Sequence, residues 1–188
     1  MRLFFAVDLS DSVRATIRQA IEDIPIASPP WRWVEPANLH ITLKFLGEIP
    51  QKWIEGLADC AHLVCRSEPF SIRLRRLGGF PSLSRPRVLF YRAEEGAKPL
   101  ETLAQELDRE LFERLGIARE KRPFRAHLTI ARIKQNLSPQ IVRLLQTVPP
   151  LGEASQRVEN LVLMKSTLRP EGAVYHPLKE FALSKSKC

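Results

Sequence analysis

Cysteine is scarce in this chain, which has three among its 188 residues: Cys60, Cys65 and Cys188. An odd number without a spaced framework argues against a disulfide scaffold and favours reduced thiols. Long apolar segments are also missing, since no stretch approaches the ~20 apolar residues that a membrane span needs. The apolar run 3–7 is too short for a signal peptide, and Asp8 interrupts it. These absences predict a cytoplasmic protein that is not embedded in a membrane.

Sequence motifs for metals and nucleoside triphosphates are missing as well. The chain has no H-E-x-x-H, no paired C-x-x-C, no obvious carboxylate cluster and no Walker A string. Cys60, His62 and Cys65 are close in sequence, but at about 100° per residue they point in three directions from a helix. We therefore expect no bound metal and no cofactor.

Positive charge is in excess, with 29 basic and 21 acidic side chains, a net charge of +8 and a pI near 9.8. A basic surface favours polyanions such as RNA, DNA or anionic lipid, and composition does not choose among them. At 44% hydrophobic residues the chain can bury a substantial core. We expect one domain over residues 1–188, built of two interleaved lobes, and no exposed heptad or apolar patch indicates anything other than a monomer.

Apolar periodicity predicts the same order of elements twice. A strand, a helix, a second strand and a second helix occupy residues 4–64, and the order recurs over residues 88–148. Ser10 and Ser138 are the expected N-caps, and Gly116 is the expected end of the helix that Pro99 opens. Between the repeats we expect a half-buried strand over 70–77 and a turn at 78–81. Two strands, near 158–167 and 173–181, follow the second repeat. The repeat predicts two lobes related by a pseudo-two-fold axis.

Each repeat carries a short string of the same form: His-Ile-Thr-Leu at residues 40–43 and His-Leu-Thr-Ile at residues 127–130. Side chains of a strand alternate between its faces, so the His and Thr of each string point the same way. One such string in an apolar strand is more often structural than functional. Two copies in matching contexts, in a chain with four histidines, indicate one shared site with two imidazoles and two hydroxyls.

These side-chain types suit acid–base chemistry on a phosphodiester. An unperturbed histidine titrates near pH 6.5, so one imidazole can accept a proton from attacking water while the other protonates the departing oxygen. Each transfer is worth roughly 10²–10⁴-fold in rate. Thr42 and Thr129 can donate hydrogen bonds to the non-bridging oxygens. Neither step calls for a metal.

Arginines flank the second string and are candidate phosphate ligands. Arg125 shares the face of His127 by strict alternation, whereas Arg132 has the opposite parity and needs a bulge or the strand's end to reach the site. Candidates for stacking on a base are Trp31, Trp33, Phe5 and Phe45, although Phe5 and Phe45 fit a core equally well.

The paired strings, about ninety residues apart, resemble the signature of the two-histidine phosphoesterase superfamily. Within it the chain is similar to the bacterial and archaeal RNA 2′,3′-cyclic phosphodiesterases, also called LigT-like or 2′-5′ RNA ligase proteins. The resemblance covers nearly the whole chain. The segments that carry it are residues 2–7, 38–47, 79–81, 86–89, 123–132, 166–168 and 172–175.

The resemblance implies a bilobal α+β fold with an antiparallel sheet in each lobe, helices outside and the active site in the central groove. It implies hydrolysis of RNA 2′,3′-cyclic phosphate ends to 2′-phosphates, with His40 as proton donor and His127 as proton acceptor. Thr42, Thr129 and Arg132 would hold the phosphate. The natural substrate stays open among tRNA fragments, small oligonucleotides and other cyclic phosphates. Two alternatives also remain: 2′-5′ RNA ligation in the same site, and an RNA-end binding protein without catalysis.

Overall fold

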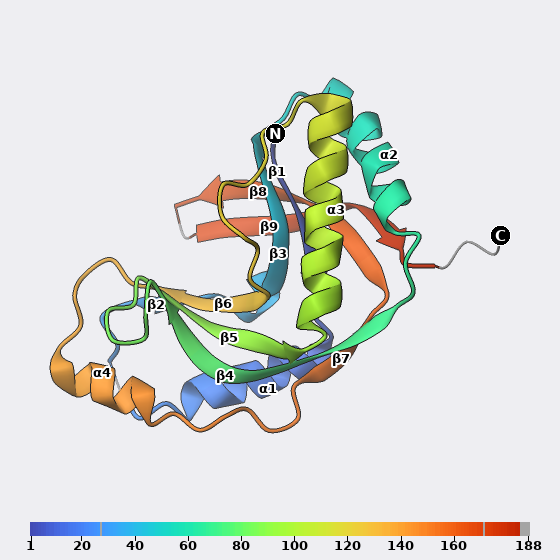
Figure 1. Cartoon of the computed structure of the whole chain (residues 1–188). Helices are drawn as coiled ribbons and strands as arrows, with labels where there is room; N and C mark the ends of the chain where they lie inside the picture. The colour runs from blue at the N-terminus through green and yellow to red at the C-terminus, as the bar shows by residue number, and fades with distance from the viewer. Residues whose placement is uncertain (27, 171, 185–188) are drawn as a thin grey trace.

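The strands of the computed structural model, which describes residues 1–26, 28–170 and 172–184, form two antiparallel sheets (Figure 1). Neighbouring strands in each sheet pair in antiparallel register. The four-stranded sheet has the order β3 (His40–Glu48), β1 (Arg2–Asp8), β8 (Asn160–Arg169), β9 (Gly172–Ala182). The five-stranded sheet has the order β2 (Arg32–Trp33), β6 (His127–Arg132), β5 (Val88–Glu95), β4 (Phe70–Phe80), β7 (Ser155–Val158). The predicted α+β class with two antiparallel sheets is confirmed.

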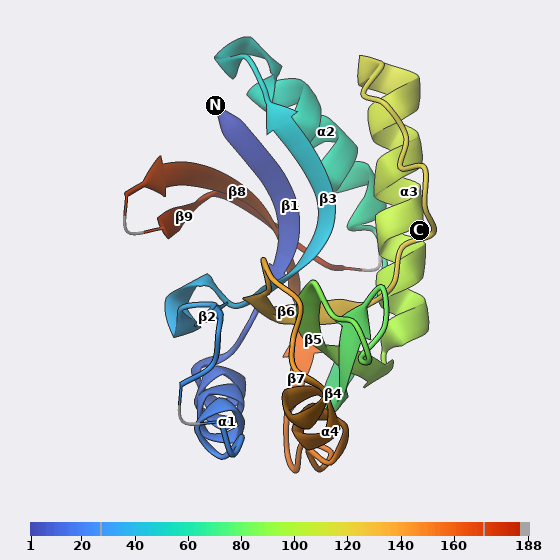
Figure 2. The ribbon, with the colours of Figure 1, turned by 90° about the vertical axis from the view of Figure 1, so that its left-hand side faces the viewer.

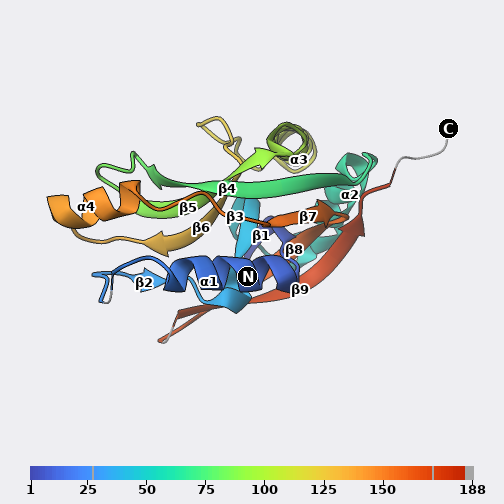
Figure 3. The same ribbon diagram turned by 90° about the horizontal axis from the view of Figure 1, so that it is seen from below.

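The helices are distributed crosswise between the sheets. They are α1 (Asp11–Glu22), α2 (Ile54–Val64), α3 (Ala97–Leu115) and α4 (Pro139–Gln146). Helix α3 follows β5 of the five-stranded sheet but packs on β3 and α2 (Figure 2). Helix α1 follows β1 but lies on the side of the five-stranded sheet (Figure 3), and the amide of its N-cap Ser10 donates to Gln156 of β7 at 2.8 Å. Figure 3 shows the separation from below, with α1 and α3 on different sides of β4, β5 and β6. The first helix of each repeat therefore lies on the sheet that holds the other repeat's motif strand.

Three predicted helix ends are confirmed, at Ser10, Ser138 and Gly116, whereas α3 begins at Ala97, two residues before the predicted Pro99. The Ser10 and Ser138 hydroxyls accept from the amides of Val13 and Ile141, which satisfies amides that have no partner inside the helix. Gly116 adopts a left-handed conformation with φ of 65° and ends α3.

The turn predicted at 78–81 is wrong. Strand β4 continues through Phe80, and Gly78 and Gly79 pair with Phe90 and Leu89 of β5. A Cβ on Gly78 would lie 2.6 Å from the Phe90 ring. Glycine is therefore needed here because an aromatic ring lies against the backbone, and not because the chain turns. The short strand β7 was also missed, since only its last residue, Val158, is buried.

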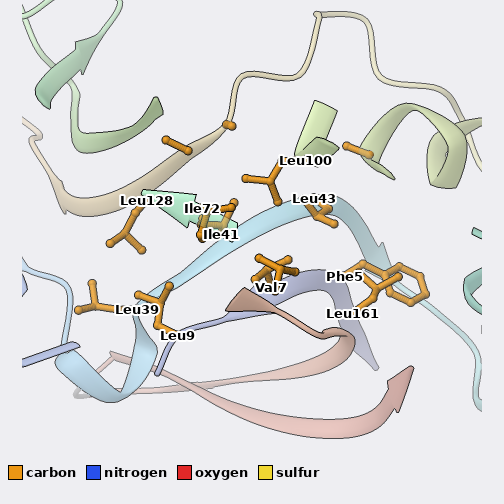
Figure 4. Packing of buried hydrophobic residues seen from close by; sticks show 14 of the residues in the cluster. Phe5, Val7, Leu9, Leu39, Ile41, Leu43, Ile72, Leu100, Leu128 and Leu161 are labelled. Carbon is orange, nitrogen blue, oxygen red and sulfur yellow. The ribbon is translucent and has the colours of Figure 1, made fainter. Parts of the chain in front are cut away.

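One large hydrophobic cluster joins the two sheets. Figure 4 shows Ile41 of β3 near Ile72 and Leu128 of the five-stranded sheet, and all three belong to this cluster. Strands β3 and β6 also contact each other directly. A smaller cluster, of Phe4, Ala6, Val162 and Met164 with Tyr175 beside it, covers the other face of the four-stranded sheet. The shared core fixes the two motif strands relative to one another.

Cys60 and Cys65 are buried free thiols, and burial raises the pKa of Cys65 to about 12. Cys188 lies outside the described residues. Among the helices that the structure describes, none is long and apolar enough to cross a membrane.

Candidate active site

His40 is the first residue of β3, and its ring orientation is fixed at both nitrogens. Nδ1 lies 2.7 Å from the Asn38 carbonyl oxygen, so Nδ1 carries a proton and donates it there. Nε2 lies 2.8 Å from Thr42 Oγ1. The neutral ring therefore accepts from the Thr42 hydroxyl, which places both side chains on one face as alternation predicted.

The segment before His40 is held by two side chains. Asn38 donates from its amide to the carbonyl of Ala173 in β9 at 2.7 Å, which fixes the residue that orients the His40 ring. Arg14 of α1 donates to the carbonyls of Pro36 and Leu39 and pairs with Asp8.

The His40 ring packs against aromatic side chains and lies beside charged ones. Ring centroids of Phe4 and Tyr175 are 4.8 and 5.1 Å from that of His40. Burial lowers the pKa of His40 below its ordinary value, while the Asn38 carbonyl and the Asp8 carboxylate oppose that shift. The free protein thus favours a neutral imidazole at this position.

His127 repeats this arrangement at the start of β6. Nδ1 donates to the Arg125 carbonyl at 2.6 Å, again two residues earlier, which leaves Nε2 as the reactive nitrogen. The rings of Phe80 and Phe90 lie 5.1 and 5.2 Å away. Burial lowers the pKa of His127, and the Arg125 carbonyl opposes that shift.

Arg132 is electrostatically close to both imidazoles, because its positive charge lowers the pKa of His40 and of His127. A bulge brings it to this face. Leu89 of β5 pairs with Ala131 while Phe90 pairs with Thr129, so β6 contains one extra residue. The extra residue reverses the parity, and Arg132 is exposed after two consecutive buried residues. The bulge that the sequence required for Arg132 is therefore present.

Strand β3 has a bulge at the matching place. Phe5 pairs with Lys44 while Ala6 pairs with Thr42, so Leu43 is the extra residue. Phe45 consequently occupies the position that corresponds to Arg132, five residues after the histidine, and is 60% exposed.

Of the four aromatic candidates for base stacking, Phe45 alone is exposed. Phe5 is fully buried in the core, and Trp31 is 9% exposed. Trp33 is half-buried and packs edge-on against Trp31 with centroids 5.4 Å apart. The core alternative was right for Phe5 and wrong for Phe45, while the two tryptophans serve packing.

The bulge in β3 also turns Lys44 inward, where sequence reasoning did not expect a charge. Lys44 Nζ lies 2.7 Å from Asp108 Oδ1 and 2.7 Å from the Ala118 carbonyl oxygen. Burial raises the pKa of Asp108, but hydrogen bonds from Lys44 and Arg119 outweigh it and hold that pKa below its usual value. This ion pair ties β3 to α3 and to the loop that leads to His127. A lysine inside an apolar strand run is the signal that could have found it.

The remaining sequence candidates are placed as follows. Thr129 is half-buried and has the same parity as His127 on β6. Arg125 contributes its backbone carbonyl to the His127 ring. His62 and His176 are exposed on α2 and β9. Within the described ranges no three His, Cys, Asp or Glu side chains gather as a metal site would require.

The sequence profile of the family described as LigT like Phosphoesterase matches this chain in two segments, residues 7–90 and 92–175. Each segment contains one His-x-Thr string, in agreement with the repeat seen in the fold.

Curated relatives and solved structures agree with this match. An RNA 2′,3′-cyclic phosphodiesterase of Thermus thermophilus is 37% identical, with 97% of this chain and 90% of the relative covered. One of Archaeoglobus fulgidus is 33% identical, with 96% and 99% covered. The crystal structure of E. coli LigT complexed with 3′-AMP superposes with a TM-score of 0.80 at 30% identity, with 97% of each chain covered. By its repeated motif, its fold and these matches, the chain belongs to the LigT-like phosphoesterase family.

Proposed function

We propose that this protein hydrolyses 2′,3′-cyclic phosphate ends of RNA to 2′-phosphates. One observation carries the proposal: two imidazoles each have Nδ1 bound to a backbone carbonyl, which leaves Nε2 for proton transfer, and the charge of Arg132 acts on both. The relatives named above carry this activity in their names.

The two histidines take different roles in the proposed reaction. Neutral His127 accepts a proton from water as the water oxygen bonds to phosphorus. Protonated His40 donates its Nε2 proton to the 3′ oxygen as the P–O3′ bond breaks. Asp8 favours this assignment, because its carboxylate raises the pKa of His40 against the lowering by burial, Arg14 and Arg132, whereas no carboxylate shifts the pKa of His127 in the described structure.

Charge on the phosphate is met by groups on the same face. Thr42 and Thr129 donate hydroxyl hydrogen bonds to the non-bridging oxygens, and Arg132 supplies a guanidinium that can bind two oxygens at once. Arg125 lies at the entrance to β6, where its side chain is exposed and can reach the RNA backbone.

The test is turnover of an oligoribonucleotide that ends in a 2′,3′-cyclic phosphate, in the presence of EDTA. The expected product carries a 2′-phosphate, and a 3′-phosphate product or no turnover would contradict the proposal. His40→Ala and His127→Ala should each lower kcat by roughly 10²–10⁴-fold while they leave binding largely intact. His62→Ala, an exposed histidine on α2, is the matched control and should retain wild-type activity.

The alternatives give different results in this assay. A protein that only binds RNA ends shows affinity without product, and its affinity does not follow a bell-shaped pH profile. Ligation requires an RNA hydroxyl in place of water and yields a longer 2′-5′-linked product.

We also propose that the protein works as a monomer in the cytoplasm. The large exposed apolar side chains of the described residues are spread over three strands and a helix: Phe45, Phe112, Leu168 and Leu178. Analytical ultracentrifugation at micromolar concentration tests the monomeric state, and a dimer mass would overturn it.

A further inference from the structure

Arg32 and Arg132 stand directly opposite each other on the neighbouring strands β2 and β6. The Cβ atoms of such a pair are about 4.5–5.5 Å apart, and like charges at this spacing destabilise a sheet. Both side chains are exposed, and neither has an ion pair or hydrogen bond with another described residue. Other arginines of the fold, such as Arg14 and Arg119, are paired with carboxylates. A ligand that places one anionic group at each guanidinium would explain why this repulsion is kept.

The backbone around Arg32 is fixed by hydrogen bonds and packing against β6. Trp33 pairs with Ala131 of β6 and packs against Trp31 on the face opposite Arg32. The Val34 amide donates to the Ile130 carbonyl at 2.8 Å, just beyond the strand pair. The backbone position of Arg32 beside Arg132 is therefore well defined.

The location of the pair indicates which anion it meets. The positive charge of Arg132 lowers the pKa of both imidazoles, so we expect Arg132 to contact the phosphate that reacts. Strand β2 is the edge of the five-stranded sheet beyond β6, so Arg32 lies one strand outward from that phosphate. A ligand that touches both arginines extends from the reacting phosphate toward the sheet edge.

We propose that Arg32 binds the phosphodiester immediately 5′ of the terminal nucleotide while Arg132 engages the cyclic phosphate itself. This inference rests on the proposed function for its terminal phosphate and adds a substrate class. A cyclic mononucleotide lacks the second phosphate, so Arg32 favours an RNA chain over a free cyclic nucleotide.

The experiment compares a diadenosine substrate that ends in a 2′,3′-cyclic phosphate with adenosine 2′,3′-cyclic phosphate. Arg32→Gln should raise KM about tenfold for the dinucleotide, the loss expected for one charge-assisted hydrogen bond. It should leave kcat and the mononucleotide KM unchanged. Loss of one contact should also reduce the slope of log affinity against log salt by about 0.7. Arg143→Gln, an exposed arginine on α4, is the control and should alter neither substrate.

Equal effects on both substrates, or none on either, would overturn the assignment of Arg32. Failure of the proposed function looks different, because wild-type protein then turns over neither substrate. In that event, calorimetry with the two 2′-phosphate products still decides the role of Arg32. Arg32→Gln should weaken binding of the dinucleotide product and leave binding of the mononucleotide product unchanged. The thermal midpoint of Arg32→Gln should equal or exceed that of wild type, because a like-charge contact is removed.

Discussion

Strands β3 and β6 share the same backbone arrangement around their histidines. Each begins at its histidine, each histidine donates from Nδ1 to the carbonyl two residues earlier, and each strand contains one extra residue just after the threonine. The backbone features that orient the two rings are thus duplicated. The side chains around them are not.

The differences lie in charge. His40 lies beside Asp8, which raises its pKa, and Arg14, which lowers it, and the ring accepts a hydrogen bond from Thr42. His127 has none of these three within the described structure. Five residues after each histidine, β3 presents Phe45 and β6 presents Arg132. The comparison shows that a symmetric scaffold can hold one proton donor and one proton acceptor, because geometry and proton affinity are set by different residues.

The largest expected effect comes from replacing each histidine in turn and comparing substrates whose leaving groups do or do not need a proton. On cyclic-phosphate RNA, His40→Ala and His127→Ala should each lose roughly 10²–10⁴-fold in kcat. On an aryl phosphodiester, whose phenolate leaves without a proton, His40→Ala should recover most of its loss and His127→Ala should not. The opposite pattern would exchange the two roles.

Lys44 in β3 corresponds to Ala131 in β6, so its ion pair is an asymmetry that stability measurements can test. Its side chain is 2% exposed and that of Asp108 is 10% exposed. Lys44→Met should lower the free energy of unfolding by about 1.5–3 kcal/mol, because the Asp108 carboxylate keeps Arg119 but loses its buried charge-assisted hydrogen bond from Lys44. Urea denaturation measures this. Arg18→Met, which removes the exposed Arg18–Glu22 pair, should cost under about 1 kcal/mol, and equal losses would contradict the burial argument.

Gly78 supports only the β6 half of the site, through Phe90. Gly78→Ala would force its Cβ against the Phe90 ring and so shift the ring that contacts His127. We expect a cost of about 1–3 kcal/mol in stability from overpacking, and a fall in kcat with little change in KM. Gly152→Ala, where a Cβ would meet nothing within 4 Å, is the control. Unchanged kinetics in Gly78→Ala would show that the ring does not position His127.

The smallest expected effect is in the pH profile. Burial lowers the pKa of both histidines, so the bell for kcat/KM should be centred on the acid side of 6.5. His127 must be neutral, which sets the acid limb, and His40 must be protonated, which sets the alkaline limb. A bound phosphate anion raises both pKa values, so the kcat profile should lie at higher pH.

Asp8→Asn removes the carboxylate that raises the pKa of His40. The alkaline limb of kcat/KM should therefore move to lower pH, and the rate at neutral pH should fall severalfold, since one unit corresponds to about tenfold. The acid limb should stay in place. Movement of the acid limb instead would assign the base role to His40.

Local chemistry made part of this structure predictable from sequence. Alternation placed His40 and Thr42 on one face, and hydroxyl caps placed the starts of α1 and α4. The bulges were not predictable in the same way, because an extra residue is defined only against a partner strand. Arg132 and Lys44 changed faces for that reason. Gly78 was read as a turn because its true constraint, Phe90, comes from another strand.

The pairing of β1 with β8 joins Arg2 to Ser166 and sets a condition on synthesis. When a ribosome has released residues through Arg132, the nascent chain already holds both histidines, both threonines and the Arg132 guanidinium. The sheet under His40 is still open on one side, and Tyr175 has not been made. A translation product that stops before β8 thus exposes the edge of β1, with Phe4 uncovered, and such edges invite pairing with other chains. Quality control acting on truncated products would meet an aggregation-prone fragment and not a partly active enzyme.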